Sequence, residues 1–99
     1  MSNVYLYIQF KIKNMDAFKQ YGAQVPDTIA LYGGKTIAVN KAPVPLHGNM
    51  DVDVCVVQQW PSLEAAEAWL NSPEYAPLKE LRDKRAMTEL TIVPIPALA

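Results

Sequence analysis

The chain has 99 residues, of which 51% are hydrophobic and 19% charged, and its formal net charge is −1. This composition is typical of a folded globular protein, and the length predicts one domain over residues 1–99. The nine Lys and Arg residues are scattered rather than gathered into a basic face, so no nucleic-acid partner is expected. The sequence has neither a secretory leader nor an apolar run near the roughly 20 residues that span a bilayer, which predicts a cytoplasmic protein without membrane contact.

The first predicted element is a β-strand over residues 4–13, where apolar and other side chains alternate strictly. One face of this strand should meet helices, because it carries only aliphatic and aromatic side chains: Val4, Leu6, Ile8, Phe10 and Ile12. The other face carries Tyr5 and Tyr7 and suits either water or a second protein surface.

A helix is predicted next, because apolar side chains recur at helical spacing over residues 18–32. Asn14 is a suitable N-cap residue, and Gly33-Gly34 should end the helix because glycine adopts the left-handed backbone conformation. Pro26 removes an amide donor in the middle of this stretch. We therefore expect either a kink, or one helix that ends near Val25 and a second that begins at Pro26.

Two more strands are predicted at residues 35–40 and 52–60, the first with Ile37 and Val39 directed inward. The loop between them, residues 42–50, contains two prolines, a glycine and the only histidine. The strand at 52–60 is apolar on both faces, which is typical of a strand that is buried on both sides.

The C-terminal part of the chain is predicted to contain a helix in two halves and a last strand. Ser62 caps the first half, whose inward face includes Leu63, and Ser72-Pro73 caps the second half. The last strand covers residues 89–95, with Pro94 at its end or on a sheet edge.

The element order is strand, helix, strand, strand, helix in two halves, strand. It predicts an α+β, ferredoxin-like split βαβ sandwich, with a four-stranded antiparallel sheet and helices on one face. The uncovered face would expose Tyr5, Tyr7, Cys55 or Val57 to water. Burying even a few hundred Å² of apolar surface is worth several kcal/mol at about 25 cal/mol per Å². We therefore predict a homodimer in which two open sheet faces dock around a two-fold axis.

Two charged or titratable side chains are candidates for chemistry. His47 is the only side chain whose unperturbed pKa lies near neutrality, which makes it a candidate general acid or base at a pocket mouth. The alternative is an exposed loop histidine. Arg82 interrupts an apolar helix stripe, and a guanidinium directed partly inward can bind a substrate carboxylate. The alternative is a structural salt bridge to Glu74 or to an acid near Asp51 and Asp53.

Five aromatic residues are candidates for the walls of a pocket between helices and sheet, and the alternative is that they are core residues. They are Tyr21, Tyr32, Trp60, Trp69 and Tyr75. Asp51 and Asp53 lack a third ligand at fixed spacing, so no metal is expected. Cys55 is expected to be buried and inert. The chain has no phosphate-binding loop, serine elbow or CxxC pair, so no cofactor is expected.

Several segments resemble one known family. The matching residues are Tyr21, Val25-Pro26, Tyr32-Gly33-Gly34-Lys35, Leu46-His47-Gly48 (against a Leu-Glu-Gly loop), Trp60-Pro61-Ser62, Glu64-Ala65-Ala66, Trp69, Asn71-Ser72-Pro73-Glu74-Tyr75 and Arg82. On these residues the chain is similar to the domain-of-unknown-function 1330 (DUF1330) family of the dimeric α+β barrel superfamily, over essentially its whole length. His47 stands where an acidic residue is usual, and Trp60 where phenylalanine is usual.

The resemblance implies a ferredoxin-like protomer and a dimer formed sheet to sheet, the dimeric α+β barrel. The wider superfamily includes cofactor-free monooxygenases, lactone isomerases, haem-degrading enzymes and pure ligand binders. One hypothesis is therefore a cofactor-independent enzyme, isomerase or monooxygenase-like, that acts on a small organic acid or carbonyl compound. In it, Arg82 would anchor an anion, His47 would transfer protons, and Tyr21 or Tyr32 would donate a hydrogen bond.

The second hypothesis is a non-catalytic dimeric module that binds a small ligand or has a structural role. A pocket between helix and sheet that contains Arg82 and a tyrosine would favour the enzyme, with Trp60, Trp69 and Tyr75 as ligand-binding walls. Space filled by Trp60 and Trp69 would favour the inert module.

Overall fold

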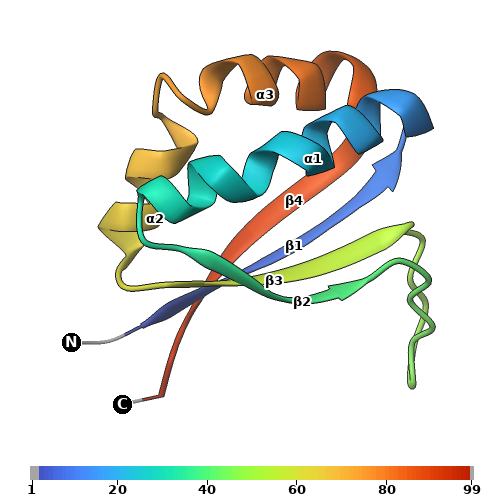
Figure 1. The fold of residues 1–99 in the computed structure, drawn as a ribbon. Helices are drawn as coiled ribbons and strands as arrows, with labels where there is room; N and C mark the ends of the chain where they lie inside the picture. Colours follow the sequence, from blue (N-terminus) through green and yellow to red (C-terminus); the bar gives the residue numbers. More distant parts are fainter. Residues whose placement is uncertain (1–2, 99) are drawn as a thin grey trace.

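The computed structural model describes residues 3–98 and contains one four-stranded antiparallel sheet with the strand order β2-β3-β1-β4. The strands are β1 (Val4–Ile12), β2 (Lys35–Asn40), β3 (Val54–Trp60) and β4 (Met87–Pro96). The helices are α1 (Met15–Leu31), α2 (Leu63–Leu70), α3 (Ala76–Leu81) and the short π-helix η1 (Arg82–Ala86). Figure 1 shows the helices together on one face of the sheet, which confirms the predicted ferredoxin-like α+β fold. None of the helices formed by residues 3–98 has the length and apolarity needed to cross a membrane.

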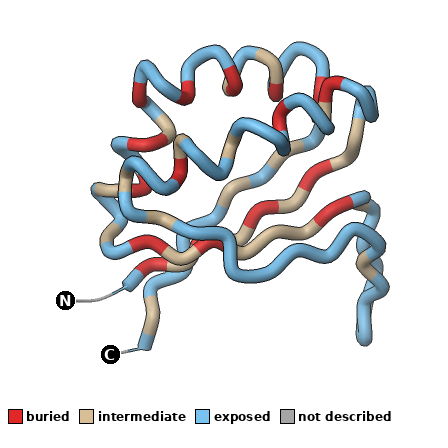
Figure 2. The backbone as a smooth tube through the Cα atoms, in the orientation of Figure 1, coloured by how far each residue is buried: buried red, intermediate tan, exposed pale blue. Residues whose placement is uncertain are grey.

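The alternation in β1 separates a buried face from an open one, as predicted. Its even-numbered residues from Val4 to Phe10 are buried under the helices, with Leu6 and Phe10 only 2% and 3% exposed, and Ile12 at the strand end is half-buried. Residues paired across antiparallel strands lie on the same face. Tyr7 therefore shares the open face with Val57 on β3 and Val93 on β4. Figure 2 shows the buried positions gathered between the sheet and the helices.

α1 continues through Pro26, so the alternative of a helix that ends near Val25 is wrong. A proline inside a helix removes one hydrogen bond and costs about 3 kcal/mol. Tyr21 and Ile29, on either side of Pro26, are both buried. Their packing on the rest of the core holds the two halves together, because most helix stability in proteins comes from tertiary packing.

Two predicted N-caps are confirmed, because Asn14 and Ser62 each accept a side-chain hydrogen bond from the amide three residues later, at 2.9 and 3.1 Å. The predicted cap at Ser72-Pro73 is wrong, because α3 begins only at Ala76 and its N-cap residue is Tyr75, which makes no side-chain cap hydrogen bond. Ser72 accepts from the Tyr75 amide at 3.2 Å and stabilises the turn before α3 instead. Gly33 follows α1 with a φ of +87°, the left-handed conformation that ends a helix.

Two predicted inward positions are wrong. Leu63 is 40% exposed, because α2 forms its buried face one turn later, at Ala66 and Trp69. Ile37 is 46% exposed, because the pairing of β2 with β3 contains a register shift at that point. A bulge of this kind interrupts the alternation on which the prediction depends. Val39 pairs with Val56 on the inner face as predicted but is 51% exposed, because β2 lies at the edge of the sheet.

α3 passes directly into η1, where Met87 N–H donates to the carbonyl of Arg82, five residues earlier. This wide turn carries Arg82, Ala86 and Met87 on the buried side of the chain. π-Turns are rare and occur often at functional sites. β4 then begins at Met87, two residues before the predicted start, and occupies a sheet edge as Pro94 indicated.

Candidate functional site

A cavity of about 280 Å³ lies between α1 and the inner face of the sheet. Small-molecule sites usually measure roughly 300–1,000 Å³, so this cavity suits a small ligand. Its walls are largely apolar and include residues from all four strands. The lining residues that are exposed to solvent all belong to α1 or to residues 36–41. The cavity therefore opens along the seam between α1 and β2.

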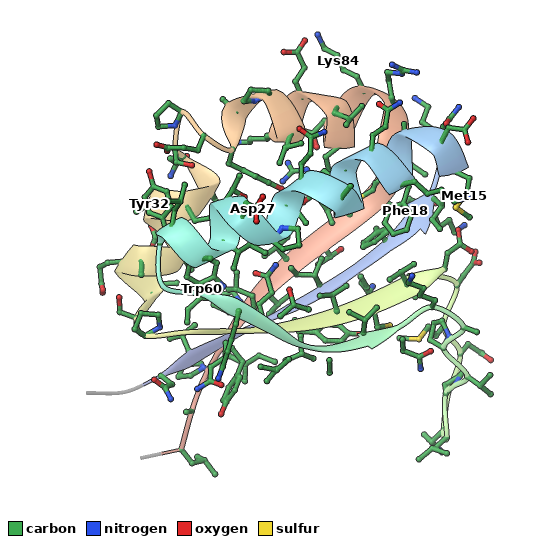
Figure 3. All side chains as sticks on the ribbon, viewed as in Figure 1. Met15, Phe18, Asp27, Tyr32, Trp60 and Lys84 are labelled. Carbon is green, nitrogen blue, oxygen red and sulfur yellow. The ribbon has the colours of Figure 1, made fainter. Side chains whose placement is uncertain are left out.

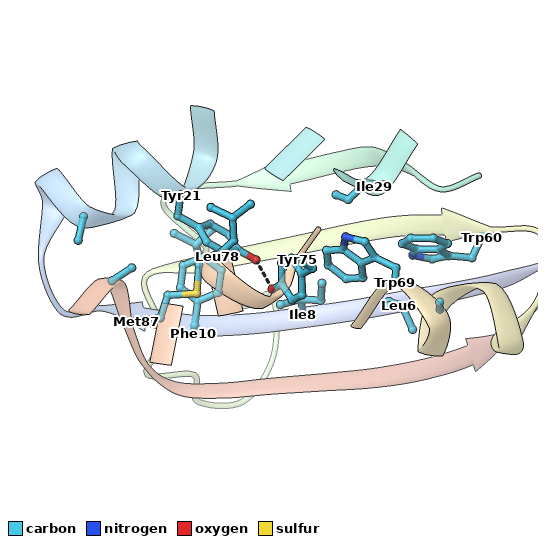
Figure 4. Packing of buried hydrophobic residues seen from close by; sticks show 14 of the residues in the cluster. Leu6, Ile8, Phe10, Tyr21, Ile29, Trp60, Trp69, Tyr75, Leu78 and Met87 are labelled. Carbon is cyan, nitrogen blue, oxygen red and sulfur yellow. Dashed lines mark hydrogen bonds between the residues drawn. The ribbon is translucent and has the colours of Figure 1, made fainter. Parts of the chain in front are cut away.

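Three of the buried polar side chains that face this cavity are joined by hydrogen bonds: Tyr21, Tyr75 and Arg82. The hydroxyl oxygens of Tyr21 and Tyr75 lie 2.6 Å apart (Figure 4), and Nη1 of Arg82 donates to the Tyr75 hydroxyl at 3.2 Å. The two hydroxyl groups carry two protons, and one of them is used between the tyrosines. One O–H therefore remains to donate to a bound group.

These groups are hydrogen-bond donors at neutral pH. Burial raises the pKa of Tyr21 well above its ordinary value, so this hydroxyl stays protonated. Burial alone lowers the pKa of Arg82, but its hydrogen bonds to Asp83 and Tyr75 raise the pKa, and the guanidinium stays charged. Within the described part of the chain, no carboxylate or imidazole lines the cavity. The site thus offers donors and positive charge, which favour an anion.

The salt bridge of Arg82 is not one of those predicted. Its Nε donates to Oδ1 of Asp83, the next residue, at 2.8 Å. Arg82 is 8% exposed, so it is both a paired arginine and a cavity residue. The two bonds to Asp83 and Tyr75 occupy two of the five N–H groups of the guanidinium.

Gln58 is a polar cavity residue that the sequence reasoning missed. It is 4% exposed and lies on the inner face of β3. The indole N–H of Trp60 donates to its Oε1 at 3.0 Å, which leaves the NH₂ group as a further donor beside the cavity. Its position was the available signal. Gln58 has the same parity on β3 as Val54 and Val56, so it must share their inward face, which is otherwise apolar.

Three of the five predicted aromatic wall residues line the cavity: Tyr21, Trp69 and Tyr75. The ring centroids of Trp69 and Tyr75 are 4.3 Å apart, and Figure 4 shows Trp69 between Tyr75 and Trp60. Trp60 is fully buried behind Trp69, with 5.3 Å between ring centroids, and is not a lining residue. The two tryptophans therefore form one wall and leave the cavity open beside them.

Tyr32 lies outside the cavity. Its hydroxyl donates to Oε1 of Glu74 at 2.7 Å, which ties the end of α1 to the turn before α3. This hydrogen bond raises the pKa of Tyr32 and lowers the pKa of Glu74. Figure 3 shows Tyr32 beside the turn that follows α2. The contact joins two elements of the fold.

His47 is exposed and is not among the cavity residues. It belongs to residues 41–53, which project from the ends of β2 and β3 on the side of the sheet away from the helices (Figure 1). The structure therefore brings together Tyr21, Trp69, Tyr75 and Arg82. It leaves His47 outside, along with Tyr32 and Trp60.

Cys55 is half-buried on the open sheet face rather than buried, because it has the outward parity of β3, and its sulfur accepts from the Tyr7 hydroxyl at 3.3 Å. Asp51 pairs with Nζ of Lys11 at 2.9 Å, and Asp53 accepts from a β1 amide at 2.8 Å. Residues 3–98 contain no group of three His, Cys, Asp or Glu side chains placed to hold a metal ion.

Residues 3–95 match the model of a family described as a domain of unknown function, DUF1330. No curated protein matches the sequence. A protein of unknown function from Rhodopseudomonas palustris has a similar solved structure, with a TM-score of 0.84 and 15% identity over 99% of this chain and 84% of that one.

Two further solved structures are similar. A dimeric ferredoxin-like protein of unknown function from Thermobifida fusca has a TM-score of 0.69 and 14% identity over 97% of this chain and 92% of that one. SnoaB, a cofactor-independent oxygenase from Streptomyces nogalater, has a TM-score of 0.60 and 17% identity over 100% of this chain and 94% of that one. At these identities the likeness shows the fold.

Proposed function

The chain belongs to the DUF1330 family, and from this premise we propose that it binds a small, largely apolar organic anion between α1 and the sheet and acts on it without a cofactor. The observation that carries the proposal is the chain of donors from Arg82 through Tyr75 to Tyr21 on the buried side of an apolar cavity. Apolar walls suit a hydrocarbon body, and buried donors suit the oxygen atoms of an acid.

The reaction class that this arrangement favours is one that passes through an anion of the substrate. Donors fixed in a buried site stabilise negative charge as it develops on an oxygen, for example when a carbonyl compound becomes an enolate. Isomerisation and cofactor-free oxygenation of an enolisable compound both use such an anion. SnoaB supports this proposal only as a protein of the same fold, because a fold hosts many functions.

In this proposal Arg82 and the hydroxyl pair of Tyr21 and Tyr75 hold the anionic oxygen, while Trp69 packs against the apolar body. No described lining residue is a base, so the substrate should be acidic enough to arrive already ionised. That requirement favours carboxylic acids, and only those phenols and 1,3-dicarbonyl compounds whose electron-withdrawing substituents lower the pKa below neutrality. His47 has no role in the cavity of its own protomer.

A non-catalytic binding module is the second candidate, and the lack of a carboxylate or imidazole among the described lining residues favours it. The two candidates differ in turnover. An enzyme would consume a bound compound, which proton NMR and an oxygen electrode detect, whereas a binding module would return it unchanged.

Arg82→Gln is expected to weaken the binding of benzoate, which is ionised at neutral pH, by about 10- to 150-fold, since a hydrogen bond to a charged group is worth about 1.5–3 kcal/mol. Isothermal titration calorimetry measures the affinities. Arg85→Gln, an exposed arginine in the same η1 turn, is the matched control and should bind as the wild type does. Equal affinities for Arg82→Gln and the wild type would remove the proposed anion site.

The open face of the sheet supports a further part of the proposal, a homodimer formed sheet to sheet. Tyr7, Val57 and Val93 form an apolar row on this face, and Val93 is 41% exposed in the single chain. The similar protein from Thermobifida fusca is described as dimeric. A second copy would cover this row, because the same patch on both partners suits a two-fold interface.

Val57→Lys is expected to convert this dimer to monomers, because a lysine in the middle of the interface would bury an unpaired charge. Analytical ultracentrifugation at micromolar concentration should give twice the 11.0 kDa of one chain for the wild type and a single chain for the variant. Leu31→Lys, at a position 68% exposed at the end of α1, should leave the dimer intact. A wild type that sediments as well-folded single chains would contradict this interface.

A further inference from the structure

The stripe of α1 that faces the cavity lacks one side chain. Phe18, Val25 and Ile29 line the cavity at helical spacing, and Gly22 lies between them on the same stripe. A helix that packs on a sheet normally carries an apolar side chain at such a position. Gly22 is instead exposed and borders the cavity, on the seam between α1 and β2.

Local structure does not explain this glycine. A Cβ atom built on Gly22 would meet no atom within 4 Å, so the space in front of it is open. Its backbone is helical, a conformation that residues with a side chain adopt readily. Glycine is also among the least favourable residues in a helix interior. A side chain at this position would, however, narrow the opening of the cavity, which Gly22 borders.

We propose that Gly22 determines which ligands the cavity admits. Its missing side chain forms the entrance, and it leaves room for the flat aryl ring or unbranched alkyl tail of a carboxylate whose charged end lies at Arg82. This inference rests on the proposed function, in which the cavity holds an organic anion. It adds the route of entry and the shape of the apolar part.

Charge at the entrance agrees with an anionic ligand. Lys41 follows β2, lines the cavity and is exposed, so it lies at the mouth of the cavity on the β2 side of the seam. Arg82 lies behind it on the buried side. Positive groups at the mouth and in the interior of an apolar cleft raise the local concentration of anions. A branched or bulky tail would meet α1 at the seam, where only the absence of a side chain leaves space.

Gly22→Leu tests this entrance. The leucine side chain is expected to occupy the open space and to weaken binding of 1-naphthoate by at least about 10-fold, the scale on which an apolar pocket discriminates by size. Its melting temperature should equal or exceed that of the wild type, because the substitution removes a helix glycine and adds apolar contact. Ala23→Leu is the matched control, since Ala23 is exposed on the same helix and does not line the cavity.

The probes are benzoate, 1-naphthoate and hexanoate, measured by titration calorimetry; for the non-fluorescent hexanoate, the intrinsic fluorescence of the two tryptophans, of which Trp69 lies in the cavity wall, is a second readout. Gly22→Ala should bind benzoate as the wild type does but lower the ratio of naphthoate to benzoate affinity. An unchanged ratio would overturn the inference, and this variant decides the matter if Gly22→Leu does not fold.

The two proposals fail in different ways. Undiminished naphthoate binding by Gly22→Leu, with binding still lost in Arg82→Gln, would overturn the entrance at Gly22 and leave the proposed function in place. A wild type that binds none of the three carboxylates would overturn the proposed function, and this inference with it.

Discussion

Trp69→Ala is expected to lower the free energy of unfolding by about 3–5 kcal/mol, the usual loss when a buried tryptophan is truncated. Trp69 is 1% exposed, and its ring packs between those of Tyr75 and Trp60, so alanine would leave an empty volume between two rings. The indole N–H also donates to Oγ1 of Thr28 at 3.0 Å, which joins α2 to α1. Thr28 keeps its own bond to the carbonyl of Val25, so most of the loss comes from packing.

Urea denaturation followed by circular dichroism measures this loss. All variants should be compared at one protein concentration, because association of the kind proposed above would make the apparent stability depend on concentration. Leu31→Ala, at a position 68% exposed on α1, is the control and should stay within about 0.5 kcal/mol of the wild type. A loss below about 1 kcal/mol for Trp69→Ala would mean that its ring does not pack in a rigid core.

β1 illustrates the part of the fold that the sequence predicts well. Its alternation identifies the inner and outer side chains, and the structure agrees from Val4 to Phe10. The prediction works because the backbone of a strand fixes a period of two, and pairing with β3 and β4 on both sides holds the register. β2 lies at an edge and contains a bulge, so the same reasoning places Ile37 on the wrong face.

Pro26 and Arg82 show why local pattern has a limit. By local propensity alone, the helix should break at Pro26. The burial of Tyr21 and Ile29 on either side keeps it continuous instead. The free energy of that packing depends on distant parts of the chain, so the residues around Pro26 do not reveal it. The position of Arg82 depends on the π-turn of η1, which no intrinsic propensity predicts. In both cases the deciding interaction is tertiary.

The candidate site divides in the same way. Residue chemistry singled out Tyr21, Tyr75 and Arg82, but their hydrogen bonds join α1, the turn before α3 and η1, and depend on how these elements pack. Gln58 could have been found by its inward parity on β3. His47 is the opposite case, because its chemistry is suitable while the loop that carries it extends away from the cavity.

Gly34→Ala is expected to lower the free energy of unfolding by about 3 kcal/mol, the upper part of the usual cost of overpacking a core. A Cβ atom on Gly34 would lie 2.7 Å from three atoms of the Trp60 ring. Trp60 is fully buried, packs on Trp69 and donates to Gln58, so its indole cannot move aside. The sequence explains both glycines after α1 by the helix end, but only Gly33 has a positive φ, and Gly34 is needed for this close approach.

A double-mutant cycle with Trp60→Phe isolates this contact. Phenylalanine has a smaller ring, so Gly34→Ala should be less harmful in that background, with a coupling free energy of about 1 kcal/mol or more. Gly22→Ala is the matched control, because its new Cβ meets nothing within 4 Å. It should raise the free energy of unfolding by about 0.5–1 kcal/mol through helix propensity alone. If Gly34→Ala is as stable as the wild type, or if the cycle shows no coupling, Trp60 does not lie against Gly34, and the wall behind Trp69 is not rigid.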